Sequence, residues 1–283
     1  MTSEKAAAPD SATRTQTIEG AIDAMPRAGL TRWASVALYV SFALGIYEAA
    51  ILSLALNSLQ SGLHVSTAQL TPAISLNLVG FAIGAWVIGF LADRLGRQFG
   101  LRLTFGVLGL GGLLTIFAWN VPTLTVARFI AGCGMGAVLA LVSLYVSEVS
   151  PRTRRGNLIA RISLVATLLV GISSVVSLPI LKALPSEGWR PLLGVGAVAL
   201  LLIPLVNRRD IVESPRWLVQ HKRLAEAEVL VRKFEKKARA ESTSETTTFV
   251  EPTAIIDAGT KTPFRSLINS KLQIGRASCR ERV

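Results

Sequence analysis

The sequence predicts an all-α membrane protein, and three observations support that prediction. Hydrophobic residues make up 51% of the 283 residues, whereas charged residues make up only 17%. The mean hydropathy of the chain is positive, at +0.48, so the chain is more apolar than a soluble protein needs to be to form a core. The apolar residues also gather into six long runs that are separated by short polar segments.

The six apolar runs have the length of transmembrane helices. Each is close to the roughly 20 residues that a helix needs to cross about 30 Å of hydrocarbon. We expect helices because lipid cannot form hydrogen bonds with an exposed backbone. The predicted spans are Trp33 to Leu56, Pro72 to Ala92, Leu101 to Trp119, Pro122 to Val146, Leu158 to Leu181 and Trp189 to Val206.

The positive charge of the chain lies mainly between the spans. The net charge is +12, from 30 basic and 18 acidic residues. The basic residues cluster after spans two, four and six, which predicts that these loops are cytoplasmic and that the N-terminus is inside. We therefore expect a multi-pass protein of the cytoplasmic (inner) membrane, and the clustering in short loops argues against nucleic-acid binding.

The segments outside the spans differ in composition. Residues 1–32 are polar and are expected to form a disordered cytoplasmic tail before the six-helix half-domain of residues 33–206. Residues 207–272 are expected to form a cytoplasmic central loop, in which Val219 to Ala240 has the apolar spacing of an amphipathic helix. Residues 273–283 are neither apolar nor patterned and resemble a translated sequencing adapter, so we expect a non-native tail.

Two ionisable residues lie deep within the spans, namely Glu48 in span one and Arg128 in span four. An isolated charge in lipid costs several kcal/mol, so such residues are functional candidates. At 1.5 Å per residue, both lie outward of the middle of their spans, by about 4 Å and 9 Å. We predict an ion pair or a water-bridged contact in the outer half of a central cavity.

Two roles for this pair remain open. The pair could be a static link between two helices. Alternatively, Glu48 could take up a proton and release Arg128, because burial and a neighbouring guanidinium shift the protonation of a carboxylate in opposite directions.

Three polar residues on the outer side of spans one and two are candidates for binding a hydrophilic solute. They are Tyr47, Asn57 and Asn77. A role in helix packing or at the membrane interface is an alternative for each.

Small residues on spans two and four predict close helix packing. Gly80 and Gly84 are spaced four apart, as are Gly132 and Gly136. Such spacing places small residues on one face of a helix and lets two backbones approach.

The sequence offers no constellation for an enzyme, a metal or another cofactor. His64 and His221 lie outside the spans, Cys133 lies within one, and Cys279 belongs to the doubtful tail. These residues make neither a disulfide framework nor a metal site.

A loop motif follows span two. The segment GFLADRLGRQ runs from Gly89, which we expect to let helices approach, to Gln98, and Asp93 lies where the helix leaves the bilayer. This segment resembles the G-x-x-x-D-R-x-G-R-[RK] loop between the second and third helices of the major facilitator superfamily. Gln98 departs from that pattern, because the family has a basic residue, Arg or Lys, at this position.

Three further motifs occur in the order of that superfamily. RFIAGCGMG begins at Arg128 and is similar to the R-x-x-x-G-x-G-x-G run of helix four. SEVSPRTRRG and ESPRWL are similar to the E-x-x-P-x-x-x-R-G and P-E-S-P-R-[WF]-L elements of sugar porters and organic-acid symporters, with Val212 replacing the first proline. The chain is thus identified as resembling the N-terminal half of a sugar-porter or organic-acid:proton symporter.

The resemblance implies twelve helices in two halves, with alternating access to a midplane site. It also implies a cytoplasmic gate held by charges, although the arginines could serve topology alone. The gate residues carried over from the motifs are Gly89, Asp93, Arg94, Gly96, Arg97, Glu148, Arg155, Glu213 and Arg216.

The predicted function is secondary active transport of a small hydrophilic solute, a sugar or an organic acid, by proton symport in a truncated fragment. The expected partners are the solute, protons, the lipid bilayer and a missing C-terminal six-helix half. The alternative is a non-transporting membrane sensor or a degenerate half-transporter.

Overall fold

The structure is a computed structural model that describes residues 11–25, 30–207 and 211–242. All regular elements in these ranges are helices. Contacts divide the chain into residues 1–245 and 246–283. The predicted tail of residues 273–283 lies outside the described residues, as does most of the central loop after the amphipathic helix.

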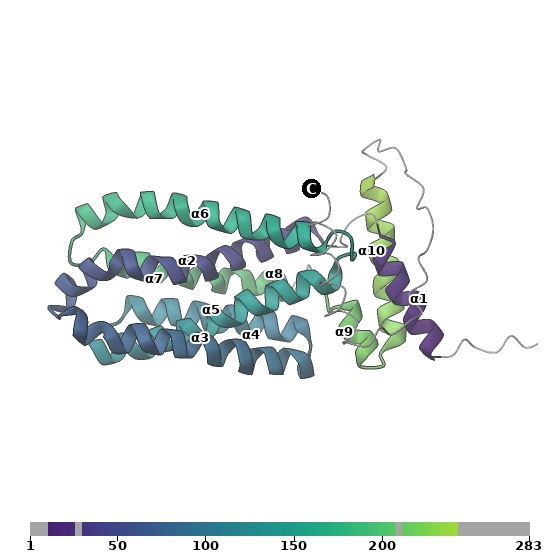
Figure 1. Ribbon diagram of the computed structural model, residues 1–283, viewed down its shortest axis with the longest axis horizontal. Helices are drawn as coiled ribbons and strands as arrows, with labels where there is room; N and C mark the ends of the chain where they lie inside the picture. The colour runs from purple at the N-terminus through teal and green to yellow at the C-terminus, as the bar shows by residue number, and fades with distance from the viewer. Residues whose placement is uncertain (1–10, 26–29, 208–210, 243–283) are drawn as a thin grey trace, which may run out of the picture. The chain divides into compact units, whose positions relative to one another are not determined.

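Five helices are long and apolar enough to cross a membrane. They confirm the first five predicted spans, with ends that differ by a few residues, and they lie side by side in Figure 1. Their bounds are α2 Arg32–Leu63, α3 Thr67–Leu95, α4 Arg97–Ile116, α5 Val121–Val149 and α6 Arg155–Ala183.

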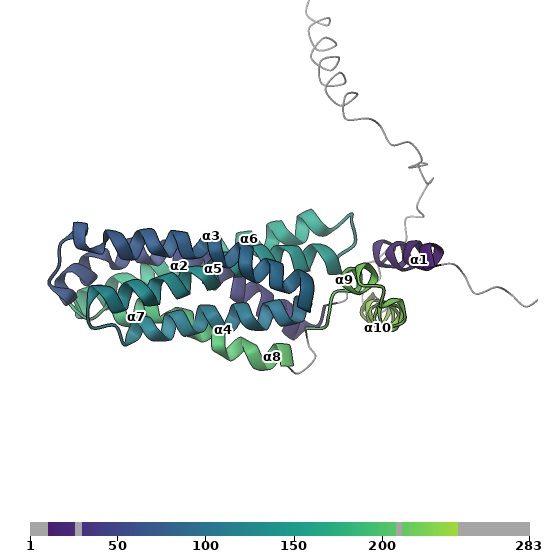
Figure 2. The ribbon, with the colours of Figure 1, turned by 90° about the horizontal axis from the view of Figure 1, so that it is seen from below.

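The sixth predicted span is not one α-helix. It consists of α7 Trp189–Gly194, the 3₁₀-helix η1 Val195–Leu202 and α8 Ile203–Asn207. A 3₁₀-helix rises about 2.0 Å per residue against 1.5 Å in an α-helix, so residues 189–207 reach roughly 30 Å despite their small number. Figure 2 shows α8 beside α4, and η1 also packs against α4.

Glycines bring α3 and α5 into backbone contact, as their spacing predicted. A Cβ atom at Gly84 would overlap the main chain of Cys133, and one at Gly136 would overlap the carbonyl of Phe81. Close backbone approach of this kind is possible only where the side chain is absent. Helices α3 and α5 are therefore closely packed, and α5 carries Arg128.

Three helices pack together outside the membrane-length segments. Helix α1 (Ser11–Asp23) packs Ile18 and Ile22 against α9 (Pro215–Gln220) and α10 (Leu224–Ser242). Helix α10 confirms the predicted amphipathic helix, and Val231 and Phe234 point into this cluster. Residues 11–23 thus differ from the disordered tail that we expected, because their few apolar side chains find a partner more than 190 positions later in the chain.

Candidate functional site

The two charges predicted to meet inside the membrane form a direct ion pair. Arg128 Nη1 donates to Glu48 Oε2 at 2.8 Å. The side chains are 0% and 1% exposed, respectively. The pair joins α2 to α5, as the depth argument predicted, and the roles of its two members stay a prediction.

Arg128 is also held from α4. Its Nη2 donates to the hydroxyl of Thr115 at 2.8 Å, and that hydroxyl donates in turn to the carbonyl of Gly111. The hydroxyl is therefore oriented with a lone pair toward the guanidinium. Three helices, α2, α4 and α5, converge on one buried cation.

The pair retains unused hydrogen-bonding capacity. Glu48 Oε1 and Arg128 Nε are buried and have no hydrogen-bond partner among the described residues. Buried polar atoms are usually paired, and each unpaired atom carries a cost of about 1–3 kcal/mol. A carboxylate with one free oxygen can accept a proton there without first breaking its bond to Arg128.

The polar ends of two predicted solute-binding residues connect helices in this structure. The Tyr47 hydroxyl donates to the carbonyl of Leu192 at 2.9 Å, and Asn77 Nδ2 donates to the carbonyl of Arg128 at 2.9 Å. Asn57 is exposed, and its main-chain carbonyl accepts a bond from Ser61. Their role toward a solute stays a prediction, and packing is the role that the contacts of Tyr47 and Asn77 support.

A pocket lies beside Tyr47 between α2, α6 and α7, with a volume of about 340 Å³. Its lining is almost wholly apolar. The hydroxyls of Ser173 and Ser177, which contribute to the lining, donate to carbonyls of their own helix. The pocket therefore offers a hydrophilic solute few free hydrogen-bonding groups.

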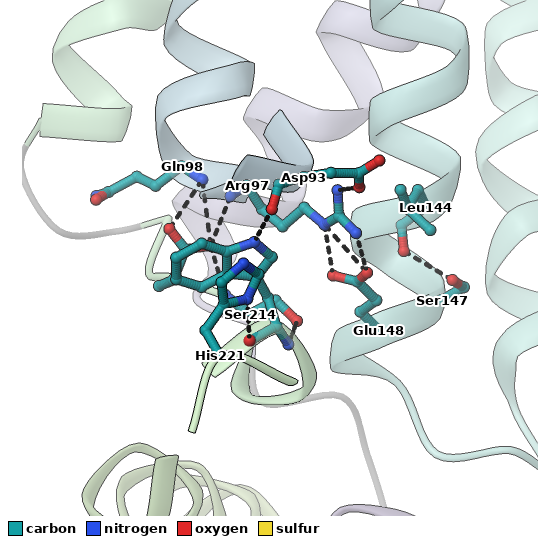
Figure 3. A network of polar contacts seen from close by, with 10 residues as sticks. Asp93, Arg97, Gln98, Leu144, Ser147, Glu148, Ser214 and His221 are labelled. Carbon is teal, nitrogen blue, oxygen red and sulfur yellow. Dashed lines mark hydrogen bonds and ion pairs between the residues drawn. The ribbon is translucent and has the colours of Figure 1, made fainter. Parts of the chain in front are cut away.

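The loop motif builds a second charge cluster at the ends of α3, α4 and α5 (Figure 3). Arg97 is 5% exposed and lies between two carboxylates. Its Nη2 donates to Glu148 at 2.8 Å, its Nε donates to the same carboxylate at 3.1 Å, and its Nη1 contacts Asp93. Arg97 thus links the end of α3 to the end of α5.

The carboxylate of Glu213 lies at the N-terminus of α4. It accepts bonds from the main-chain N–H of Arg97 at 2.7 Å and of Gln98 at 3.4 Å. A carboxylate is favoured there because the first N–H groups of a helix lack internal partners. Gly96 makes room for it, since a Cβ atom at this position, where φ is +110°, would overlap Glu213. The ESPRWL segment is thereby fastened to the loop motif.

Gln98, the position where the loop departs from the superfamily pattern, has a structural use. Its amide donates to the carbonyls of Val206 at 3.2 Å and of Ile211 at 2.9 Å. The departure therefore ties α4 to the end of the sixth segment.

Some predicted gate residues lie apart from this cluster. The expectation for Gly89 is wrong within the described residues, because a Cβ atom there would meet nothing within 4 Å. Arg94 is exposed and its guanidinium stacks on Phe90, 4.2 Å from the ring centroid. Arg155 and Arg216 instead face α1.

The partner of these two arginines is Asp23, which sequence analysis did not identify. Arg216 Nη2 lies 2.8 Å from Asp23 Oδ1, and Arg155 Nη2 lies 3.9 Å from it. Arg152 contacts the same carboxylate through its side chain at 3.0 Å. An acidic residue in a polar segment carries no local signal for such a contact.

Thr115 and Trp217 were also missed. Thr115 is one of several polar residues within apolar spans, and only the fold brings it to Arg128. The indole N–H of Trp217 donates to the carbonyl of Asp93 at 2.8 Å, which adds a neutral bond to the charge cluster. Within the described residues, no group of three His, Cys, Asp or Glu side chains could hold a metal ion.

Comparison with known proteins places the chain in a family of transporters. Residues 26–273 match the family described as "Sugar (and other) transporter". The chain is 31% identical over 180 residues to the putative metabolite transport protein YyaJ of Bacillus subtilis, which covers 64% of this chain and 39% of that protein. It is 33% identical over 209 residues to putative polyol transporter 1 of Arabidopsis thaliana, which covers 71% of this chain and 40% of that protein.

A solved structure shares the fold. The major facilitator superfamily proton:xylose symporter XylE of E. coli matches with a TM-score of 0.63 at 21% identity, over 81% of this chain and 52% of that one. The chain spans about two-fifths of the length of the curated relatives it matches. These relatives are transporters and not enzymes.

Proposed function

Because the chain belongs to the family of sugar and other transporters, we propose that it forms the N-terminal half of a secondary transporter for a sugar or another small hydrophilic solute, driven by proton symport. The chain is an integral, multi-pass membrane protein with the major facilitator fold. The observation that carries the coupling proposal is the buried pair of Glu48 and Arg128.

Coupling follows from the energetics of this pair. While Glu48 is ionised, the two charges neutralise one another in a site that is closed to bulk solvent. Protonation of Glu48 removes half of the pair and leaves Arg128 with Thr115 and its free Nε. A buried cation without a counter-charge is unstable. Arg128 would therefore favour binding an oxygen atom of the solute, or the carboxylate of an organic acid.

The charge cluster around Arg97 is proposed to stabilise a closed cytoplasmic gate. It holds the ends of α3 and α5 together and fastens the segment before α9 to α4. A gate must open in each cycle, and Asp93 is 60% exposed, so water can replace its contact at modest cost.

The proposed partner is a second six-helix half, with lipid around both halves. Helix α6 exposes a row of large apolar side chains, which includes Leu164, Leu168, Ile172 and Val175. An exposed apolar surface of this kind requires lipid or protein to cover it. The basic loops favour a cytoplasmic N-terminus in the inner membrane.

The test is transport by the protein that carries this chain, reconstituted in liposomes with an imposed pH gradient and a panel of pentoses, hexoses, polyols and organic acids. For the solute that is accumulated, Glu48→Gln should abolish accumulation but retain exchange. Glu187→Gln is the matched control, because Glu187 is 54% exposed and pairs only with Arg190 among the described residues. Unchanged accumulation in Glu48→Gln would contradict proton coupling, and no uptake of any solute would favour the non-transporting alternative.

A further inference from the structure

The sixth segment changes from α to 3₁₀ geometry where it passes the buried ion pair. Residue 196 is the second residue of η1, and a Cβ atom there would lie 3.3 Å from Glu48 Cδ and closer still to Oε1. The residue is glycine, so the carboxylate fits against its main chain. A 3₁₀ stretch within a longer helix often marks a hinge.

Glycines on both sides keep η1 close to α4. A Cβ atom at Gly112 of α4 would lie 2.5 Å from the main-chain nitrogen of Ala197 and 2.7 Å from the carbonyl carbon of Gly196. The backbones of the two elements are therefore in contact beside Glu48. No side chain at residue 112 or 196 separates α4 and η1 there.

The oxygen that faces Gly196 is the one without a hydrogen bond. Glu48 Oε2 binds Arg128, whereas Oε1 lies against Gly196 and has no partner among the described residues. A proton arriving at Glu48 from water would bind Oε1. That oxygen is covered, since Glu48 is 1% exposed.

We propose that Gly196 is a positioning residue for Glu48, and that η1 is a lid over the proton-accepting oxygen of that carboxylate. This inference rests on the proposed coupling role of Glu48. Gly196 lets the carboxylate reach Arg128, and η1 keeps water from Oε1 while the lid is closed. A larger residue at position 196 would push the carboxylate away from Arg128.

The geometry of η1 also supplies a way to open the lid. If its eight residues returned to α geometry, the segment would shorten by about 4 Å and turn Gly196 to a different direction. The hydrogen bonds of η1 would be exchanged within the segment, so no buried backbone group would need to become unpaired. Movement of the sixth segment would thereby expose Oε1 to a proton.

Among the residues that the structure describes, few charged or titratable groups lie around Glu48. Arg128 faces it from α5, and Tyr47 precedes it on α2 with its hydroxyl bound to Leu192. From α4, the Thr115 hydroxyl reaches Arg128 but is not titratable in the accessible pH range.

The test is labelling of Glu48 by a hydrophobic carbodiimide, which adds to protonated buried carboxyl groups, in the protein that carries this chain, reconstituted in liposomes. Labelling is followed by mass spectrometry across pH, and Glu48→Gln gives the background. In Gly196→Ala, the methyl group should displace the carboxylate from Arg128, so the extent of labelling of Glu48 should increase several-fold. Gly171→Ala is the matched control, because that glycine of α6 faces open space.

An unchanged labelling profile in Gly196→Ala would overturn the positioning role. Gly112→Ala is the second variant, since the atoms nearest to its methyl group would be main-chain atoms of η1, which it should lift from α4. Gly112→Ala should increase the rate of Glu48 labelling several-fold. An unchanged rate would refute the role of η1 as a lid, whether or not Gly196→Ala folds. Because labelling needs no solute, changed labelling together with normal accumulation by Glu48→Gln would refute proton coupling but would still support the positioning of the Glu48 carboxylate by Gly196.

Discussion

The pair of Glu48 and Arg128 and the contacts of Asp23 have similar lengths but opposite surroundings. The membrane pair is at 2.8 Å and at most 1% exposed. The contact of Asp23 with Arg216 is also at 2.8 Å, but Asp23 is 25% exposed and Arg152, which shares it, is 70% exposed. Water can replace the contacts of Asp23 but not the contact between Glu48 and Arg128. Distance alone therefore does not rank these ion pairs by their contribution to stability.

The cluster around Arg97 lies between these extremes. Arg97 is almost as buried as Arg128, whereas its partners Glu148 and Asp93 are 10% and 60% exposed. The three sites form a series in which water becomes more available. Substitutions along this series should have decreasing effects on stability.

The largest effect is expected for Arg128→Met. The variant leaves the Glu48 carboxylate buried without its partner, which should destabilise the chain by about 3–5 kcal/mol if the carboxylate stays ionised. Unfolding in mixed micelles titrated with sodium dodecyl sulfate measures this change. The double variant with Glu48→Gln should be more stable than Arg128→Met alone, and a double variant that is less stable would refute charge pairing as the cause.

A smaller effect is expected for Arg97→Ala. The substitution removes charge-assisted bonds to Glu148 and Asp93, each worth about 1.5–3 kcal/mol when fully buried, but water can reach both carboxylates. We expect a total loss of about 2 kcal/mol. Arg94→Ala is the control, because exposed Arg94 contacts only the Phe90 ring among the described residues and should change stability by less than about 0.5 kcal/mol.

A still smaller effect on stability is expected for Asp23→Asn. Partly exposed ion pairs contribute about 0–1 kcal/mol and are weakened by salt. The change should instead appear as faster amide hydrogen exchange in α1 at low salt, with the difference from wild type shrinking in 0.5 M salt. Equal exchange rates at low salt would show that Ile18 and Ile22 alone hold α1 in place.

The smallest effect is expected for Arg152→Gln. Its side chain is largely hydrated, and Asp23 retains Arg155 and Arg216. The stability should stay within about 0.5 kcal/mol of wild type in the same micelle titration. A loss of stability as large as that of Arg97→Ala would contradict the ranking of these sites by their exposure to water.

The sequence alone was enough to predict the membrane helices, the amphipathic helix and the meeting of Glu48 with Arg128. Each of these depends on a local property, namely the length of an apolar run, the 3.6-residue period, or a charge in a segment that lipid surrounds. Motif similarity implied a gate role for the loop residues, which stays a prediction, and Asp93, Arg97, Glu148 and Glu213 come together in the structure.

Tertiary structure decided the contacts that join distant segments. Thr115 supports Arg128, Asp23 binds arginines that lie more than 120 positions away, and Gly196 lies against Glu48. Nothing near these residues in the sequence distinguishes them from other threonines, aspartates and glycines. The tertiary structure also decided the 3₁₀ geometry of η1. This apolar segment packs against α4, and its composition alone does not distinguish a 3₁₀-helix from an α-helix.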